Sequence, residues 1–242
     1  GENYNTIYYF IESPVEPGVL FTGSDCGLVH LSRDNGRNWL NITPAGLPEC
    51  SIHSIEVSPH DKGTAYIAAT RYKFNDFAAY TYKTTDYGKT WTRISDGIRA
   101  DDFLKVIRED PKTKGLLYGG AERGFYVSFD GGKRWNQLQL NLPIVPVTDL
   151  IVRDNDLVAS TAGRALWILD DLSPLQQSAG KLESFKIFQP KPTVRFSSYQ
   201  APWLPEFIPG IGKNPDNGVL LSYFLPENAD SNEVKLDILD AT

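Results

Sequence analysis

Short apolar stretches alternate with polar turns along the first 170 or so residues of this 242-residue chain. The stretches are rich in β-branched and aromatic residues and are bounded by turns containing Pro, Gly, Asn or Asp, which is typical of strands joined in hairpins. Three times a strand, a turn and a second strand follow in the same order, at residues 6–23, 52–68 and 103–120, and a fourth copy covers residues 147–160. The pattern therefore predicts an all-β fold.

A box of the form Ser/Thr-x-Asp-x-Gly-x-x-Trp follows each of the first three copies. Its defining residues are Ser32, Asp34, Gly36 and Trp39, then Thr84, Asp86, Gly88 and Trp91, then Ser128, Asp130, Gly132 and Trp135. Asp86 lies 52 residues after Asp34, and Asp130 lies 44 residues after Asp86. A repeat of this length indicates a solenoid, a propeller or another array of equivalent units.

The box residues favour a structural role. Ser, Thr and Asp side chains hydrogen-bond nearby backbone groups in tight turns, Gly adopts backbone conformations that other residues resist, and Trp offers a large apolar surface with one N–H donor. Three equivalent carboxylates on three equivalent turns are badly placed to converge on one substrate. We therefore expect each box to fasten two strands of its own repeat.

Four strands per repeat, arranged radially, give a β-propeller. We predict about four four-stranded blades over residues 1–176, three with a box and one with a degenerate box. A Pro-rich connector then covers residues 177–217. Residues 218–225 and 233–240 alternate as two strands of a β-hairpin.

The boxes resemble the Asp-box, or BNR, repeats of sialidases, of glycosidases that cleave oligoxyloglucan and of the sortilin family. Residues 163–172 resemble the closing blade of bacterial sortilin-like proteins that are labelled glycosyl hydrolases. Asp171 falls at the Asp position of this fourth box, whereas Leu169, Ser173 and Gln176 take the Ser, Gly and Trp positions. The resemblance implies that the chain is the later part of a larger propeller and that residues 218–242 open an immunoglobulin-like module.

Charge and cysteine content narrow the function classes. With 24 basic and 30 acidic residues and a pI near 5.1, the chain has no basic field for a phosphate backbone, and no apolar run approaches the length of a membrane span. We expect no nucleic-acid partner, no membrane insertion, no metal and no cofactor. Cys26 and Cys50 lie on segments that reach the same rim of a propeller, so one disulfide and two free thiols both stay open. A disulfide would favour an extracytoplasmic location, which the resemblance also implies.

Propeller ligands usually meet the rim formed by the turns between second and third strands and by the blade-to-blade links. On this rim we place an aromatic excursion of the second blade and two further arginines. The candidate residues are Arg71, Tyr72, Phe74, Phe77, Tyr80, Arg123 and Arg164. The aromatic residues are suited to ligand binding, or else cover a neighbouring blade. The arginines are suited to clamping a carboxylate, or else form ordinary salt bridges.

Catalysis of glycoside hydrolysis needs two carboxyl groups about 5–9.5 Å apart. Asp101, Asp102 and Glu122 are the weak candidates on the rim, although adjacent Asp residues more often form turns. Two function classes stay open. The first is an extracytoplasmic glycosyl-hydrolase-like module that binds or processes glycan. The second is a sortilin-like module that binds peptides without catalysis. In either case the open edges of the blades are expected to meet further blades or a second copy of the chain.

Overall fold

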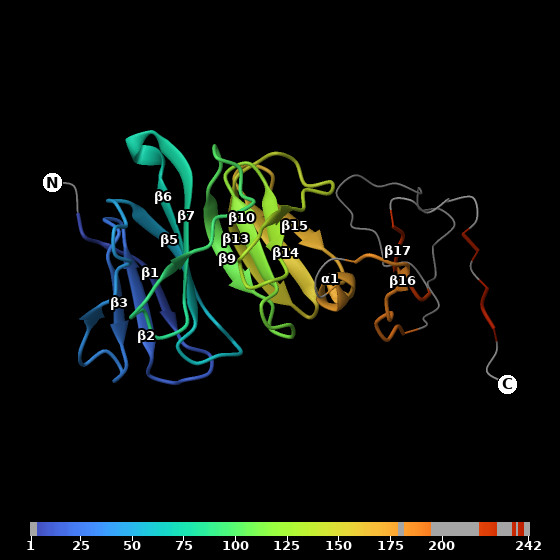
Figure 1. Cartoon of the computed structure of the whole chain (residues 1–242), viewed down its shortest axis with the longest axis horizontal. Coiled ribbons are helices and arrows are strands. Elements are labelled where there is room, and N and C mark those ends of the chain that lie inside the picture. The colour runs from blue at the N-terminus through green and yellow to red at the C-terminus, as the bar shows by residue number, and fades with distance from the viewer. Residues whose placement is uncertain (1–3, 179–181, 195–217, 227–233, 236, 240–242) are drawn as a thin grey trace, which may run out of the picture. The chain divides into compact units, whose positions relative to one another are not determined.

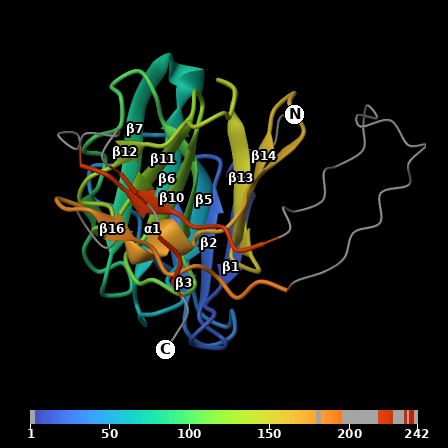
Figure 2. The same cartoon turned by 90° about the vertical axis from the view of Figure 1, so that its right-hand side faces the viewer.

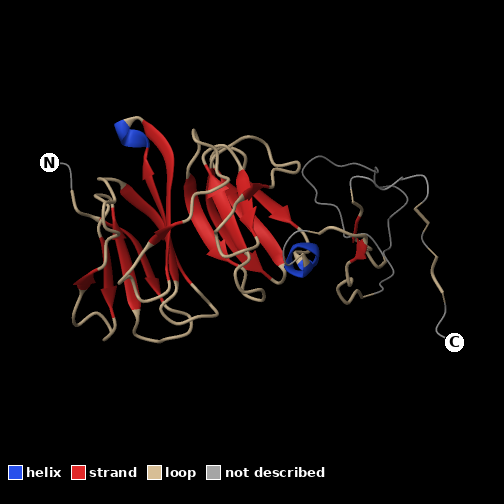
Figure 3. Ribbon diagram, in the orientation of Figure 1, coloured by secondary structure: helices blue, strands red, loops and turns tan. Residues whose placement is uncertain are grey.

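The computed structural model describes residues 4–178, 182–194, 218–226, 234–235 and 237–239. The chain divides into two compact units, residues 1–172 and 173–242. Figure 3 shows that strands and loops form most of the described chain, with helical turns at η1 (Tyr72–Phe74) and α1 (Ser173–Gln177). The all-β prediction is confirmed.

Four antiparallel sheets follow one another along the first unit, and most of their strands are labelled in Figures 1 and 2. The first contains β1 (Ile7–Glu12), β2 (Leu20–Ser24), β3 (Val29–Ser32) and β4 (Leu40–Asn41). The second contains β5 (Ser51–Val57), β6 (Ala65–Arg71), β7 (Asp76–Thr84) and β8 (Thr92–Arg93). The third contains β9 (Leu104–Glu109), β10 (Leu117–Ala121), β11 (Phe125–Ser128) and β12 (Asn136–Gln137). The fourth contains β13 (Val147–Arg153), β14 (Asp156–Thr161) and β15 (Leu166–Leu169).

These sheets are the blades of a partial β-propeller, as the repeats predict, and we number them one to four. The first strands of consecutive blades contact one another, β1 with β5, β5 with β9 and β9 with β13. The second strands β6 and β10 are buried almost throughout, because a neighbouring blade covers each face. Small residues on these strands allow the neighbouring blades to approach closely. A Cβ atom on Gly120 would lie 2.5 Å from the Val147 side chain of blade four.

Blade four differs from the prediction of four strands, since its described residues form only three. After β15 the chain continues into α1 instead of folding back as an outer strand. The alignment of Asp171 with the box position is nevertheless supported by the backbone. The residue after the box Asp donates its backbone N–H to a carbonyl in the turn between the first and second strands of each blade. Leu172 donates to Asn155 in this way, just as Asn35, Tyr87 and Gly131 donate to Gly18, Gly63 and Gly115. Without the Gly and Trp of a box, the turn that would return the chain is missing.

The three complete boxes form the same set of hydrogen bonds. In blade two, Thr84 Oγ1 donates to Asp86 Oδ1 at 2.8 Å and accepts the N–H of Gly88 at 2.9 Å. Asp86 Oδ1 also accepts the backbone N–H of Thr90 at 2.9 Å. Gly88 has a φ of 78°, in the left-handed region that favours glycine. Each box is therefore closed by contacts within about eight residues of sequence.

The second unit contains α1 and a two-stranded sheet of β16 (Lys186–Ile187) and β17 (Tyr223–Phe224). In the described part of this unit, β17 pairs with β16. Residues 227–233, 236 and 240 of the predicted hairpin between residues 218–225 and 233–240 lie outside the described residues, so this hairpin stays a prediction. Residues 195–217 of the predicted connector lie outside the described residues.

Candidate functional site

Hydrogen bonds place the predicted rim segments together in every blade. In blade two, Arg71 Nε at the end of β6 donates to the carbonyl of Glu49 ahead of β5 at 2.9 Å. Asp25, in the turn between β2 and β3, bonds the backbone of Thr6 ahead of β1. The Glu122 N–H donates to the carbonyl of Phe103, and the Ala162 N–H donates to that of Pro146. Each turn between a second and a third strand therefore meets the start of its own blade's first strand. The rim exists as a structural feature of the first unit.

An aromatic ladder runs along this rim, and we define it as Tyr8, His53, Tyr72, Phe77 and Phe103. Tyr8 meets His53 edge to face at 5.2 Å between ring centroids, and His53 meets Tyr72 at 6.1 Å. Tyr72 stacks on Phe103 at 5.9 Å with an interplanar angle of 11°, and Phe77 stacks on the same ring at 6.4 Å. The ladder therefore joins the starts of three blades to the aromatic excursion.

The ladder has a buried base and exposed outer rings. Phe103 is only 1% exposed, whereas Tyr8 is 55%, Tyr72 40% and Phe77 41% exposed. Burial and the neighbouring cations Lys105 and Lys73 lower the pKa of His53 to about 4, so its imidazole is neutral at physiological pH. The result is a largely apolar surface built from rings held in place by one another.

The rim prediction includes Tyr72 and Phe77 but neither Tyr8 nor Phe103. Like His53, these two residues each stand near the start of a first strand, and this shared place in the repeat is the signal that would have found them. Phe74, another predicted rim residue, is half exposed at the tip of the excursion, with the Arg71 guanidinium 5.3 Å from its ring centroid. The excursion thus keeps exposed rings and also packs against the next blade through Phe103.

Arg71 is held inside the excursion. Its Nη1 lies 2.5 Å from Asp76 Oδ2, and its Nε donates to the carbonyl of Glu49 at 2.9 Å. The Tyr80 hydroxyl donates to the same Asp76 oxygen at 2.7 Å. Hydrogen bonds from Tyr80 and Ala78, together with the Arg71 charge, lower the pKa of Asp76. The predicted rim residues Arg71 and Tyr80 therefore stabilise the shape of the loop.

The other two rim arginines occupy separate environments. Arg123 Nη1 pairs with Asp101 Oδ2 at 2.9 Å, and Arg99 pairs with the same carboxylate at 3.1 Å. Hydrogen bonding from Arg99 lowers the pKa of Asp101. Arg164 donates to the carbonyl of Gly163 at 3.1 Å. The described contacts of the three predicted arginines are thus local ones, within their own segments or with nearby carboxylates.

The three weak catalytic candidates are also engaged in the fold. Asp102 is 1% exposed and accepts hydrogen bonds from the Arg123 N–H and the Tyr126 hydroxyl, both at 3.1 Å. Burial raises its pKa. Glu122 Oε2 pairs with Lys105 Nζ at 2.6 Å, beside the ladder. Asp101 is neutralised by its two arginines, so these carboxyls form no poised pair.

Both cysteines are free thiols in the structure. Cys26 Sγ donates to Asn5 Oδ1 at 2.6 Å, and Cys50 is buried next to Gly27. Burial raises the pKa of Cys50 to about 12, which keeps it protonated and unreactive. Of the two alternatives for these residues, the structure shows the free thiols.

Arg108 connects four blades through an ionic cluster on the first strands, a feature that the sequence did not lead us to predict. Arg108 Nη1 lies 3.5 Å from Glu56 of β5, and Nη2 lies 2.6 Å from Asp149 of β13 and 3.1 Å from the Tyr9 hydroxyl of β1. Burial raises the pKa of Glu56 to about 7. Glu56, Arg108 and Glu109 line one cavity with residues of blades one and four. Opposite charges at the same register of consecutive first strands were the available signal.

Within the described ranges, no three His, Cys, Asp or Glu side chains converge in a way that would hold a metal ion. None of the helices that the structure describes is long and apolar enough to span a bilayer.

Comparison with known proteins supports the architecture. No protein-family model matches this chain. The chain is 27% identical over 119 residues to vacuolar protein sorting/targeting protein 10 of Chaetomium globosum, a match that covers 48% of this chain and 7% of that protein. The chain therefore spans a small part of the length of this relative.

Solved structures match a larger share of this chain. YCF48 bound to D1 peptide has a TM-score of 0.53 at 17% identity over 69% of this chain and 52% of its own. The GH74 xyloglucanase from Xanthomonas campestris has a TM-score of 0.54 at 16% identity over 67% of this chain and 29% of its own. The chain thus spans about half of the one and less than a third of the other. These likenesses confirm the propeller fold and the resemblance to sortilin-like and glycosyl-hydrolase-like propellers.

Proposed function

We propose that this chain is a binding module without catalytic activity and that the aromatic ladder receives a peptide segment carrying apolar side chains. The exposed rings of Tyr8, Tyr72 and Phe77 above the buried Phe103 carry this proposal. Rigid aromatic side chains bind apolar groups at little entropic cost and recur in the energetic centres of protein interfaces. The ladder is such a surface at the start of the first strands.

The polar side chains around the ladder favour a peptide over a sugar as the ligand. A sugar presents many hydroxyl groups and needs polar partners for them. Next to the ladder, Glu122 is paired with Lys105, Asp76 with Arg71, and Asp101 with two arginines. A ligand that uses mainly apolar contacts leaves these pairs intact. The relatives include a sorting protein and a propeller with a bound peptide, which supports the same choice.

The test is a peptide library and a glycan array, both probed with the chain and with matched variants. Tyr72→Ala and Phe77→Ala remove exposed rings of the ladder, whereas Phe10→Ala removes a ring that is 57% exposed elsewhere on β1. We expect selected peptides to bind at least tenfold more weakly to the ladder variants and equally well to the Phe10 variant. Equal binding by all four proteins, or no peptide binding, contradicts the proposal.

A second candidate function is the binding or hydrolysis of glycan, which the resemblance to glycosyl hydrolases implies. Its specific support is Glu56, since a carboxyl with a pKa of about 7 beside a second carboxyl, Glu109, in a cavity is suited to general acid catalysis. Glycan hydrolysis by the chain that disappears in Glu56→Gln would favour this candidate. Binding on the glycan array without hydrolysis would place a sugar on the ladder instead.

We infer that the module acts outside the cytoplasm, as its resemblance to sortilin-like proteins implies, and a secretion reporter fused to the full-length protein tests this. The open faces of blades one and four are inferred to be covered by further blades or by a second copy of the chain. Trp39 on blade one is 42% exposed, unlike Trp135, which supports a missing neighbour.

A further inference from the structure

Apolar residues of each first strand rest on a small residue in the second strand of the preceding blade. A Cβ atom on Gly23 of β2 would overlap the Ile52 side chain of β5 and would lie 3.2 Å from Ile55. Val147 of β13 rests on Gly120 of β10 in the same way. A small residue on one blade and an apolar pair on the next are therefore the two halves of a blade-to-blade contact.

The contact between blades two and three has the same two halves. Leu104 and Ile107 of β9 share one buried cluster with Ala68 of β6. Leu104 is 1% exposed and Ile107 is fully buried. Each of the three contacts within the first unit thus buries its apolar residues on glycine or alanine.

Blade one carries the apolar half of a further contact on its open face. The register of β1 against β2 makes Ile7 and Phe10 the counterparts of Ile52 and Ile55. Ile52 and Ile55 are fully buried, whereas Ile7 is 64% and Phe10 57% exposed. Ile7 and Trp39 also line a cavity of about 420 Å³ on this blade. Among the described residues, nothing covers this face.

Blade four carries the other half of such a contact. Ser160 lies three residues after Leu157, as Gly120 lies three residues after Leu117. Each of these leucines pairs with the last residue of its blade's third strand, so Ser160 takes the place of Gly120. A small residue is therefore present on blade four at the position that receives the next blade.

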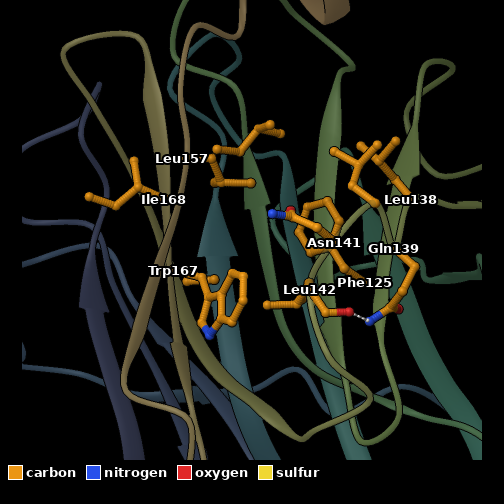
Figure 4. A pocket seen from close by; sticks show the side chains of 11 residues that line it. Phe125, Leu138, Gln139, Asn141, Leu142, Leu157, Trp167 and Ile168 are labelled. Carbon is orange, nitrogen blue, oxygen red and sulfur yellow. Dashed lines mark hydrogen bonds between the residues drawn. The ribbon is translucent and has the colours of Figure 1, made fainter. Parts of the chain in front are cut away.

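The surroundings of Ser160 are apolar and lie on the open side of blade four. Val158 is two residues before Ser160 on β14, so both side chains face the same side, and Val158 pairs with Ile168 of β15. Figure 4 shows the Trp167 side chain turned toward Phe125 of blade three, whereas Ile168 points away from it. The face around Ser160 is thus turned away from blade three.

We propose that the open face of blade one receives blade four of a second copy of this chain, with Ile7 and Phe10 seated on Ser160 of that copy. A twofold axis repeats the contact, so two chains of four blades close a ring of eight. Eight blades lie within the usual range of roughly 4–8 for propellers. This inference does not depend on the peptide surface and selects the second copy from the two neighbours considered above.

The two faces are suited to each other because each supplies what the other lacks. Both expose apolar side chains, and large exposed apolar patches mark interaction sites. The most exposed members are Ile7, Phe10, Trp39, Ile151 and Ile168. A closed pair of chains covers both faces at once, whereas a contact that did not close would leave one of each kind free and would give filaments.

The first experiment is sedimentation equilibrium of the full chain over a wide range of concentrations. We expect an equilibrium between one and two chains, with no heavier species at the highest concentration. A single-chain mass throughout overturns the proposal and assigns the two faces to other blades or partners. Masses that grow beyond two chains overturn it as well, because they show that the contact does not close.

Paired charges test the register of the contact. Ile7→Glu places a charge on one face and Ser160→Lys fills the small seat on the other, so each variant is expected to raise the dissociation constant at least tenfold. The double variant is expected to associate more tightly than either single one, because opposite charges then meet across the contact. Leu40→Glu is the matched control, at a residue of the same blade that is 62% exposed on β4, and should leave association unchanged.

The same variants exclude other ways of pairing two chains. Circular dichroism confirms that each variant is folded before its mass is measured. Association weakened by Ile7→Glu but not by Ser160→Lys would pair blade one with blade one and overturn the proposal. A double variant that associates no better than the single ones also overturns it, since Ile7 and Ser160 then do not meet.

Discussion

The contribution of each box tryptophan to stability depends on how far its neighbours bury the indole. Trp135 is 1% exposed and donates to Ile94, whereas Trp39 is 42% exposed on the open face of blade one. No described residue accepts a hydrogen bond from the Trp39 indole. The same residue type at the same place in the repeat therefore contributes very different amounts to stability.

We predict that Trp135→Ala lowers the free energy of unfolding by about 3–5 kcal/mol, the usual cost of removing a buried tryptophan. Trp39→Ala is the matched control and is expected to cost less than about 1.5 kcal/mol, because water already reaches its ring. Urea denaturation followed by circular dichroism measures both. Equal costs would show that Trp39 is buried by a contact that the first unit does not contain.

The raised pKa of Glu56 predicts that the free energy of unfolding depends on pH. Burial raises its pKa from 4.5 to about 7, so the folded chain binds the proton of this carboxyl more tightly than the unfolded chain does. Its contribution therefore favours folding below pH 4.5 and is lost as the pH rises to about 7, by an amount on the order of 3 kcal/mol. Glu56→Gln is expected to flatten the stability curve over this interval in denaturation series at pH 4.5 to 8. An unchanged slope in the variant contradicts this assignment.

At the scale of the element, the box turn is held by one carboxylate. Hydrogen bonds from the side chain and backbone of Thr90 lower the pKa of Asp86 to about 2, and bonds from Asn38 lower that of Asp34 to about 2. A depressed carboxyl stabilises the fold above its ordinary pKa near 4, and this contribution is lost as the pH falls toward 2. The turns are thus a source of acid sensitivity in the strands that they join.

Asp86→Ala is expected to lower the melting temperature at pH 7 by several degrees and to have a much smaller effect at pH 2.5, where the wild-type carboxylate has begun to protonate. Lys89→Ala, an exposed substitution in the same turn, serves as the control and should change little at either pH. Differential scanning calorimetry gives both values. A shift of equal size at the two pH values would assign the effect to packing instead of to the charged hydrogen bonds.

At the scale of the whole first unit, the blades leave two faces without a neighbour. On blade four, Ile151, Val158 and Ile168 pair across three strands and lie in one row, with Ile151 and Ile168 each 58% exposed. β15 also presents an outer edge with no fourth strand among the described residues. Exposed apolar rows and free strand edges promote association.

We predict that two copies of this chain associate through these faces. Multi-angle light scattering at increasing concentration should approach twice the mass of one chain. Ile168→Lys places a charge in the apolar row and should shift the equilibrium toward the single chain, whereas Lys89→Ala should not. A single-chain mass at every concentration contradicts the prediction and leaves further blades as the neighbours of these faces.

The candidate site could be predicted from the sequence only in part. The aromatic excursion stood out because it is longer and more aromatic than its equivalents, and Tyr72 and Phe77 do form part of the ladder. The structural roles of Arg71 and Tyr80 could not be predicted from the sequence. Both side chains turn toward Asp76 of the same excursion, and only the folded structure shows this direction. Arg108 was overlooked because each of its partners lies on a different strand.

The sequence by itself determined the repeated turns, the strands that they join and hence the propeller blades. The physical reason is that the bonds closing each box, such as those among Thr84, Asp86 and Thr90, connect residues only a few positions apart. Tertiary structure decided which side chains meet in the ladder and in the Arg108 cluster. These contacts depend on which strands lie side by side, and they join residues some 20 to 100 positions apart, as between His53 and Tyr72 or between Tyr9 and Arg108, so they leave no local pattern in the chain.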